Sequence, residues 1–241
     1  MLVAFMACTL AALAGSWCIA AQPADSDPQA LDLSTLRGSA KVNALIATVA
    51  DRQRELRSMR ARFTQTKSSS MLLEETESTG ELSYLAPDLV RWDFSRPDSM
   101  VIVVSQDMVT TFHPDVGRAQ RVKISQNHRK LVGVFAGTQS LDELKAHFRI
   151  TLSDAGGSEP YRLTLNPIHR AVKKRLQHVL IEVDRALLLP VVVEYHETDG
   201  DNTRYEFSGM ELNPALEAAS FRLELGEDVE VETIDATSGA G

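Results

Sequence analysis

The stretch that decides the fold runs from Gly80 to Asp115 and reads GELSYLAPDLVRWDFSRPDSMVIVVSQDMVTTFHPD. It contains four runs that favour β-strands, at residues 80–85, 89–94, 100–105 and 108–113. Turn signals separate the runs, and Ala86-Pro87-Asp88 is typical of them. A parallel crossover takes a dozen or more residues, so strands this close together must pair as antiparallel hairpins.

The same pattern continues on both sides of this stretch. Upstream, Met59, Ala61 and Phe63 alternate with polar residues, which is typical of a half-buried strand. Further strand-like runs lie at residues 71–77, 118–124, 148–153, 161–165, 176–184, 190–197 and 203–210. An open sheet of about ten strands tends to curl. The predicted fold class is α+β and mainly β: a large curled antiparallel sheet that forms a half-open β-barrel lidded by helices.

Two helical regions accompany the predicted sheet. From Val42 to Leu56 the apolar residues recur every three or four positions, which predicts an amphipathic helix before the first strand. The strand pattern breaks at residues 126–148, where a short helical turn is expected. A second helix follows there, because Ser140 and Glu143 form a capping box.

The chain divides into four predicted segments. Residues 1–21 hold an apolar run followed by small residues, which predicts a cleaved signal peptide and export to the periplasm. An uncleaved membrane anchor is the alternative, but polar residues and a proline interrupt the apolar run. Residues 22–38 are expected to be a flexible leader, 39–232 a single domain and 233–241 a flexible tail. Within the domain, Asn213-Pro214 predicts a helical turn and residues 221–225 an extended segment.

Composition and missing motifs exclude several classes of protein. The formal net charge of −8 disfavours binding to nucleic acid and to anionic membrane surfaces. Both cysteines, Cys8 and Cys18, lie in the predicted signal peptide, which excludes disulfides and thiol chemistry from the mature domain. No nucleophile elbow, phosphate-binding loop or two-histidine metal motif is present. We therefore expect no catalytic activity, no metal and no cofactor.

Two features of the sequence point to binding. Several strands carry large apolar residues on one face, which is either an ordinary core or the wall of a binding cavity. The residues predicted to line that cavity are Phe63, Leu82, Tyr84, Trp92, Phe94, Val101, Val103, Phe112, Leu163, Ile181, Val193 and Phe207. The second feature is a basic run with Arg170, Lys173, Lys174 and Arg175, which is either a solvated strand entry or a surface for docking a partner.

The order of several short motifs resembles the LolA-like family of periplasmic lipoprotein carriers. The motifs are Phe63-Thr64-Gln65, Gly80-Glu81-Leu82, Pro87, Arg91-Trp92-Asp93-Phe94, Pro97, Gln106-Asp107, Phe112-His113-Pro114-Asp115, Leu189-Pro190, Gly200, Asn213-Pro214 and Phe221. The resemblance implies a monomeric carrier whose hydrophobic cavity takes up acyl chains of lipoproteins or a related lipid. It also implies an inner-membrane transporter that supplies the cargo and an outer-membrane receptor that accepts it.

The resemblance further implies a lid over the cavity. Leu131, Val134 and Phe135 are the residues expected on that lid. Such carriers typically have an arginine before the proline matched by Pro87, and this arginine tethers the lid. Here the position is Ala86, and Arg91 is a candidate substitute. The alternative function is a periplasmic sensor or regulatory binding module on the same scaffold.

Overall fold

The computed structural model describes residues 33–69, 74–105, 107–123 and 144–235. The predicted signal peptide and the predicted lid residues Leu131, Val134 and Phe135 lie outside the described residues.

Helix α1 spans Gly38–Glu55 and confirms the predicted amphipathic helix, although it begins four residues earlier. Leu45, Ile46 and Val49 are fully buried, as their three-to-four spacing predicts, and Arg52 lies in the last turn, where the helix dipole favours a cation. The predicted flexible leader, residues 22–38, is packed at its C-terminal end, because Leu33 is only 3% exposed and lies in the core.

In the part of the chain that the structure describes, twelve strands form one sheet. They are β1 (Ser58–Ser68), β2 (Thr76–Leu85), β3 (Leu89–Arg96), β4 (Met100–Ser105), β5 (Met108–His113), β6 (Arg118–Lys123), β7 (Phe148–Ser153), β8 (Tyr161–Pro167), β9 (Leu176–Val183), β10 (Pro190–Glu197), β11 (Asn202–Leu212) and β12 (Glu230–Asp235). Their order is β12-β6-β5-β4-β3-β2-β1-β11-β10-β9-β8-β7. Every neighbouring pair is antiparallel except β12 and β6, so the sheet is mixed rather than purely antiparallel.

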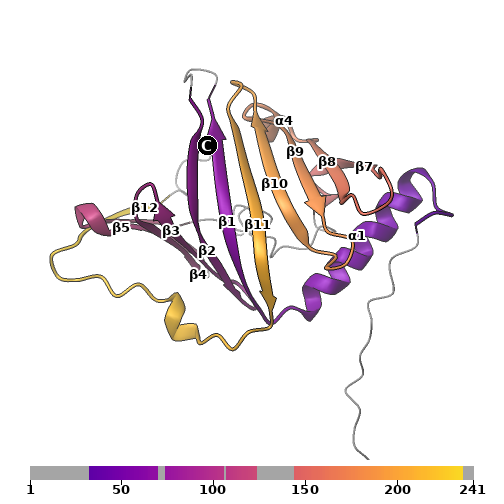
Figure 1. The fold of residues 1–241 in the computed structure, drawn as a ribbon. Helices are drawn as coiled ribbons and strands as arrows, with labels where there is room; N and C mark the ends of the chain where they lie inside the picture. Colours follow the sequence, from indigo (N-terminus) through magenta and orange to yellow (C-terminus); the bar gives the residue numbers. More distant parts are fainter. Residues whose placement is uncertain (1–32, 70–73, 106, 124–143, 236–241) are drawn as a thin grey trace, which may run out of the picture.

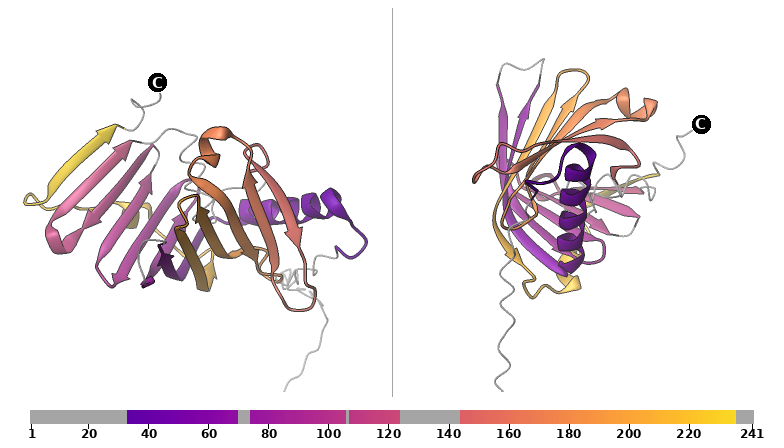
Figure 2. Two further views of the ribbon diagram at one scale, coloured as in Figure 1. Left: turned by 90° about the horizontal axis from the view of Figure 1, so that it is seen from above. Right: turned by 90° about the vertical axis from the view of Figure 1, so that its right-hand side faces the viewer.

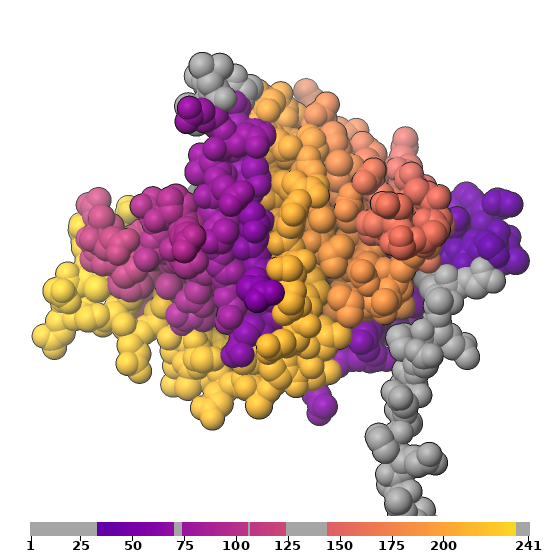
Figure 3. All heavy atoms as spheres, viewed as in Figure 1, coloured from indigo at the N-terminus to yellow at the C-terminus, as the bar shows by residue number. Residues whose placement is uncertain are grey.

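The sheet curls strongly, which confirms the predicted half-open barrel (Figure 1). Seen from its end, the sheet wraps around one side and α1 lies inside the curve (Figure 2). We call the face that carries α1 and the core the inner face, and the opposite face the outer face. Figure 3 shows β1 and β11 adjoining along the middle of the molecule. This pair joins the early strands to the late ones.

The strand prediction is wrong at one boundary. Residues 71–77 and 80–85 are expected to form two strands, but Thr76–Leu85 is a single strand, β2, which pairs with β1 along its length. Thr79 and Gly80 mark an irregularity in the pairing of β2 with β3 instead of a turn. Small polar residues at a strand pairing irregularity and at a turn look alike in sequence, which explains the error.

The segment after β11 also differs from its prediction. Asn213 has a left-handed backbone with φ 57° rather than beginning a helix, and its side chain Oδ1 accepts a 2.7 Å hydrogen bond from the Arg57 amide. The short helix η2 comes later, at Ala218–Phe221, and Arg222 after it has an extended backbone, in keeping with the predicted extended segment. Strand β12 then extends to Asp235, over the first three residues of the predicted tail. The connection runs along the lower edge of the molecule (Figure 3).

An ion-pair cluster at Asp154 ties α1 to the sheet. Asp154 lies after β7, and its carboxylate pairs with Lys41 of α1 at 2.7 Å and with Arg185 from the β9–β10 connection. Hydrogen bonds from Lys41 and then Arg185 lower the pKa of Asp154 to about 2. The negatively charged carboxylate is therefore the form that the folded chain favours.

Removing this charge should loosen the attachment of α1. Asp154→Asn is expected to lower the free energy of unfolding by about 1 kcal/mol at pH 7, since solvent screens part of the interaction. The pKa of Asp154 is lower in the folded chain than in the unfolded chain. The ionised carboxylate therefore stabilises the fold above about pH 4, and this stabilisation is lost as the pH falls towards 2. Urea unfolding at pH 7 and pH 2 tests this, because the variant and the wild type should differ much less at pH 2 than at pH 7. An equal difference at both pH values would contradict it.

Candidate functional site

The strand register brings most of the predicted cavity residues onto the inner face. Residues paired across antiparallel strands share a face, and the register pairs Leu82 with Trp92 and Phe63 with Phe207. Following the pairs across the sheet places nine of the twelve predicted residues on this face: Phe63, Leu82, Tyr84, Trp92, Phe94, Leu163, Ile181, Val193 and Phe207. All nine belong to one apolar cluster.

An aromatic cluster occupies the part of the inner face formed by β1, β3 and β11. The Phe63 ring centroid lies 4.8 Å from Trp92 and 4.9 Å from Phe94, both in edge-to-face geometry. Trp92 also lies 5.3 Å from Tyr205 and 5.9 Å from Phe207. These separations are within the range in which aromatic pairs attract one another beyond simple burial. Trp92 is thus the centre of a wall of rings.

Polar groups occur at one border of this aromatic cluster. The Gln65 side-chain amide donates a hydrogen bond to the Tyr205 hydroxyl, and Gln65 is only 5% exposed. Burial raises the pKa of Tyr205, and burial raises that of Tyr195 well above its ordinary value, so both phenols are neutral. Gln65, Tyr195 and Tyr205 are absent from the predicted cavity residues. The alternation of Tyr205 with Phe207 is the sequence signal that could have found Tyr205.

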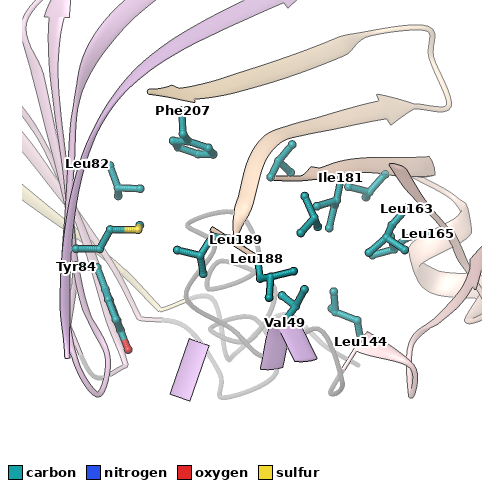
Figure 4. Close-up of a cluster of buried hydrophobic side chains, with 14 of the residues drawn as sticks. Val49, Leu82, Tyr84, Leu144, Leu163, Leu165, Ile181, Leu188, Leu189 and Phe207 are labelled. Carbon is teal, nitrogen blue, oxygen red and sulfur yellow. The ribbon is translucent and has the colours of Figure 1, made fainter. Parts of the chain in front are cut away.

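The remaining predicted residues on the inner face lie near α1. Figure 4 shows Leu163 and Ile181 in the same part of the core as Val49 of α1 and Leu144. Leu163, Ile181 and Val193 are fully buried. In this half α1 lies over the sheet, whereas the aromatic rings gather in the other half, which carries the candidate site.

Three of the predicted cavity residues lie on the other side of the sheet. Val101 pairs with Asp93 and Phe112, and Val103 pairs with Arg91, so Val101, Val103 and Phe112 are on the outer face. The prediction that they line the inner cavity is therefore wrong. The run Val101-Ile102-Val103-Val104 is apolar at every position, and without alternation the sequence does not tell which residues face inward.

The outer face has its own cavity beneath the segment that precedes β12. It has a volume of about 580 Å³, and its lining includes Val101 and Phe112 of the sheet and Leu216 and Leu223 of the segment. Arg91 holds the segment there, since it binds the Asp93 carboxylate with contacts as short as 2.7 Å and donates to the Ser220 carbonyl at 3.0 Å. Arg91 is therefore an outer-face residue.

The structure thus gives Arg91 a partner in the segment before β12, whereas the predicted lid that it was expected to tether lies outside the described residues. Ala86, which occupies the expected arginine position, packs partly buried against the core and donates its amide to the Arg57 carbonyl at 2.8 Å.

In the described part of the chain, no three His, Cys, Asp or Glu side chains gather where they could hold a metal ion. Among the described helices, none is both long and apolar enough to cross a membrane. The basic run forms a short helix, α4 (Arg170–Lys173), between β8 and β9 and leads directly into β9.

Comparisons with known proteins agree with this geometry. Residues 54–224 match the family described as outer membrane lipoprotein carrier protein LolA. The outer-membrane lipoprotein carrier protein of Azotobacter vinelandii is 25% identical over 71% of this chain and 79% of its own length. That of Pseudomonas fluorescens Pf-5 is 22% identical over 71% of this chain and 79% of its own length.

A solved structure shares the fold. An uncharacterized conserved protein from Thermus thermophilus superposes with a TM-score of 0.51 at 10% identity, over 80% of this chain and 99% of that one. At this identity the similarity concerns the fold alone.

Proposed function

The chain belongs to the LolA family of outer membrane lipoprotein carrier proteins, as its motifs predict, and from this we propose that it binds acyl chains on its inner face. The cargo is a lipoprotein or a related lipid. The observation that supports the proposal most directly is the aromatic cluster around Trp92, because it gathers a large apolar wall on the inner face of the sheet.

The physical need for such a carrier follows from the hydration of acyl chains. Each methylene group exposed to water is unfavourable by about 0.8 kcal/mol, so one long acyl chain carries a barrier on the order of 10 kcal/mol. An apolar wall removes most of that barrier. Charged groups would restore it, and the buried phenols Tyr195 and Tyr205 remain neutral.

Release of the cargo requires loose packing around the chain. Met59 pairs with Tyr84, and Met100 pairs with Phe94, so both methionines lie on the inner face beside aromatic residues. Methionine is flexible and polarizable, which suits a surface that adapts to different chains and releases them. These residues support binding that depends on apolar contact rather than on one fixed shape.

The proposed role is shuttling without catalysis. The protein acts in the periplasm as a monomer, takes cargo from an inner-membrane transporter and passes it to an outer-membrane receptor. Transfer proceeds down a gradient of affinity, so no bound nucleotide and no covalent intermediate are required of this chain.

Native mass spectrometry tests the proposal. The full chain is expressed, isolated from a periplasmic extract without detergent, and any bound molecule is extracted into organic solvent. We expect an acylated peptide or lipid in amounts up to one equivalent. An empty protein that also fails to bind a fluorescent fatty acid would overturn the carrier function. A membrane-protein partner captured by such a lipid-free protein would favour the sensor module.

A further inference from the structure

The basic residues around α4 lie apart from the aromatic cluster. Arg170 and Lys173 belong to α4, and Lys174 and Arg175 follow it directly. All four side chains are exposed, and none forms an ion pair with another residue that the structure describes. In a chain with a formal net charge of −8, they make a concentrated positive surface. We call residues 168–175 the α4 surface.

The α4 surface is held firmly at one end of the sheet. Thr198, in the β10–β11 turn, donates its amide to the Arg175 carbonyl and its hydroxyl to the Lys174 carbonyl, both at 3.0 Å. On the other side, the Ile168 amide donates to the His147 carbonyl at 3.0 Å. Two neighbouring segments thus fix the backbone that carries the cations.

Nearby acidic groups leave the α4 surface positive. The β10–β11 turn carries Glu197, Asp199 and Asp201. The Asp199 carboxylate accepts the Asp201 amide at 3.2 Å, and the Asp201 carboxylate accepts the Ser69 hydroxyl at 2.8 Å. Both carboxylates thus have partners at the turn, and the four cations of residues 170–175 outnumber the three acidic residues there.

Further cations and an apolar residue complete the surface. Lys145 and Arg149 are exposed in the segment that leads into β7 and on β7 itself, next to the end of β8 from which α4 starts. Ile168 is 44% exposed, although it is large and apolar. Cations beside an exposed apolar side chain are typical of segments that lie at the headgroup layer of a membrane.

The position of α4 favours a membrane over an acidic protein. Figure 2 shows α4 at the margin of the molecule, and it lies between the end of β8 and the start of β9. A helix of four residues offers much less area than a stable protein interface buries, whereas a bilayer presents phosphate groups that even a small cluster of cations can contact.

The overall negative charge does not prevent this contact. The Debye length is about 8 Å at physiological ionic strength, so charges far from the contact are largely screened. Each Lys or Arg near an anionic bilayer strengthens binding about fivefold. Four of them strengthen it by about several hundredfold, which is enough for a contact that forms and dissociates readily.

We propose that the α4 surface binds the phosphate headgroups of anionic phospholipids. It brings the protein to a membrane surface independently of whether the inner face holds cargo. The local charge thereby reverses the expectation, drawn from net charge, that anionic membranes repel this chain.

Vesicle flotation tests the proposal with the full chain. The vesicles contain equal parts phosphatidylglycerol and phosphatidylcholine, or phosphatidylcholine alone. The variant replaces Arg170, Lys173, Lys174 and Arg175 by Gln. We expect wild-type binding to the anionic vesicles only, a loss on the order of several hundredfold in the variant, and a large loss when salt is raised to about 0.5 M. Ile168→Ser should weaken binding severalfold.

A matched control distinguishes the effect of the α4 charges on vesicle binding from the effect of the net charge. Arg57, Arg96, Arg121 and Arg222 are exposed residues on other parts of the chain, and replacing them by Gln gives the same formal charge of −12 (−8 − 4). This control should bind anionic vesicles within about threefold of wild type. An equal loss in the control, or a wild type that ignores anionic vesicles, would overturn the proposal. Because fatty-acid uptake is measured separately, failure here leaves the carrier function standing.

Discussion

Trp92→Glu is expected to reduce the affinity for a fluorescent sixteen-carbon fatty acid by at least a hundredfold. Trp92 is 6% exposed and lies at the centre of the rings of Phe63, Tyr205 and Phe207. The substitution removes the largest apolar contact surface of the wall. It also places a carboxylate where an acyl chain would have to strip it of water. A fluorescence titration measures the effect.

Two further variants keep this result interpretable. Trp92→Phe retains a ring and should keep binding within about tenfold, even though it shortens the side chain. Phe112→Glu introduces the same charge on the neighbouring part of the outer face and should leave binding unchanged. The far-UV circular dichroism of each variant reports whether the sheet is formed. If Trp92→Glu and wild type bind the fatty acid equally well, the aromatic cluster is only core.

Gly80→Ala is expected to destabilise the fold by about 3 kcal/mol, since the added methyl group would overpack the sheet. A Cβ atom at Gly80 would lie 2.1 Å from the Asp93 carbonyl oxygen and 2.7 Å from the Phe63 ring. The carbonyl belongs to the backbone of β3 and cannot rotate away, so the pairing of β2 with β3 must open. Urea unfolding followed by circular dichroism measures the loss.

Gly117→Ala provides the control for this experiment. Gly117 has φ 61°, and no atom lies within 4 Å of a Cβ built there. Its substitution by Ala tests backbone strain alone and should lower the free energy of unfolding by about 1 kcal/mol. Adding Phe63→Leu to Gly80→Ala should not restore stability, because the contact with the Asp93 oxygen remains. Equal stability of the two glycine variants would show that the sheet yields at Gly80.

The aromatic site was largely predictable because apolar and polar residues alternate along its strands. In β3 the apolar residues Val90, Trp92 and Phe94 alternate with Arg91 and Asp93, so the inner face follows from the sequence. In β4 every residue from Val101 to Val104 is apolar, and the inward positions were not predictable. Only the pairing of Trp92 with Ile102 decides that Val101 and Val103 face outward.

Contacts between segments that are distant in the chain could not be predicted, for a different reason. Arg91 and Ser220 are 129 positions apart, and nothing in either segment indicates that one donates to the other. The same holds for β12, whose acidic residues pair with β6 in parallel, with Glu230 bound to Arg118 at 3.1 Å. From sequence alone, a charged segment near the end of a chain is interpreted as a solvated tail, because nothing local indicates its partner strand.

By itself, the sequence determined the amphipathic helix, most of the strands and their antiparallel neighbours, the aromatic inner face of β3 and the family. These depend on periodicity and turn chemistry over a few residues, where local sterics and apolar burial act. The tertiary structure alone decided the outward direction of Val101, the attachment of the segment before β12, and the cluster of cations beside Thr198. Those features depend on contacts between segments that are distant in the chain, and such contacts leave no local pattern.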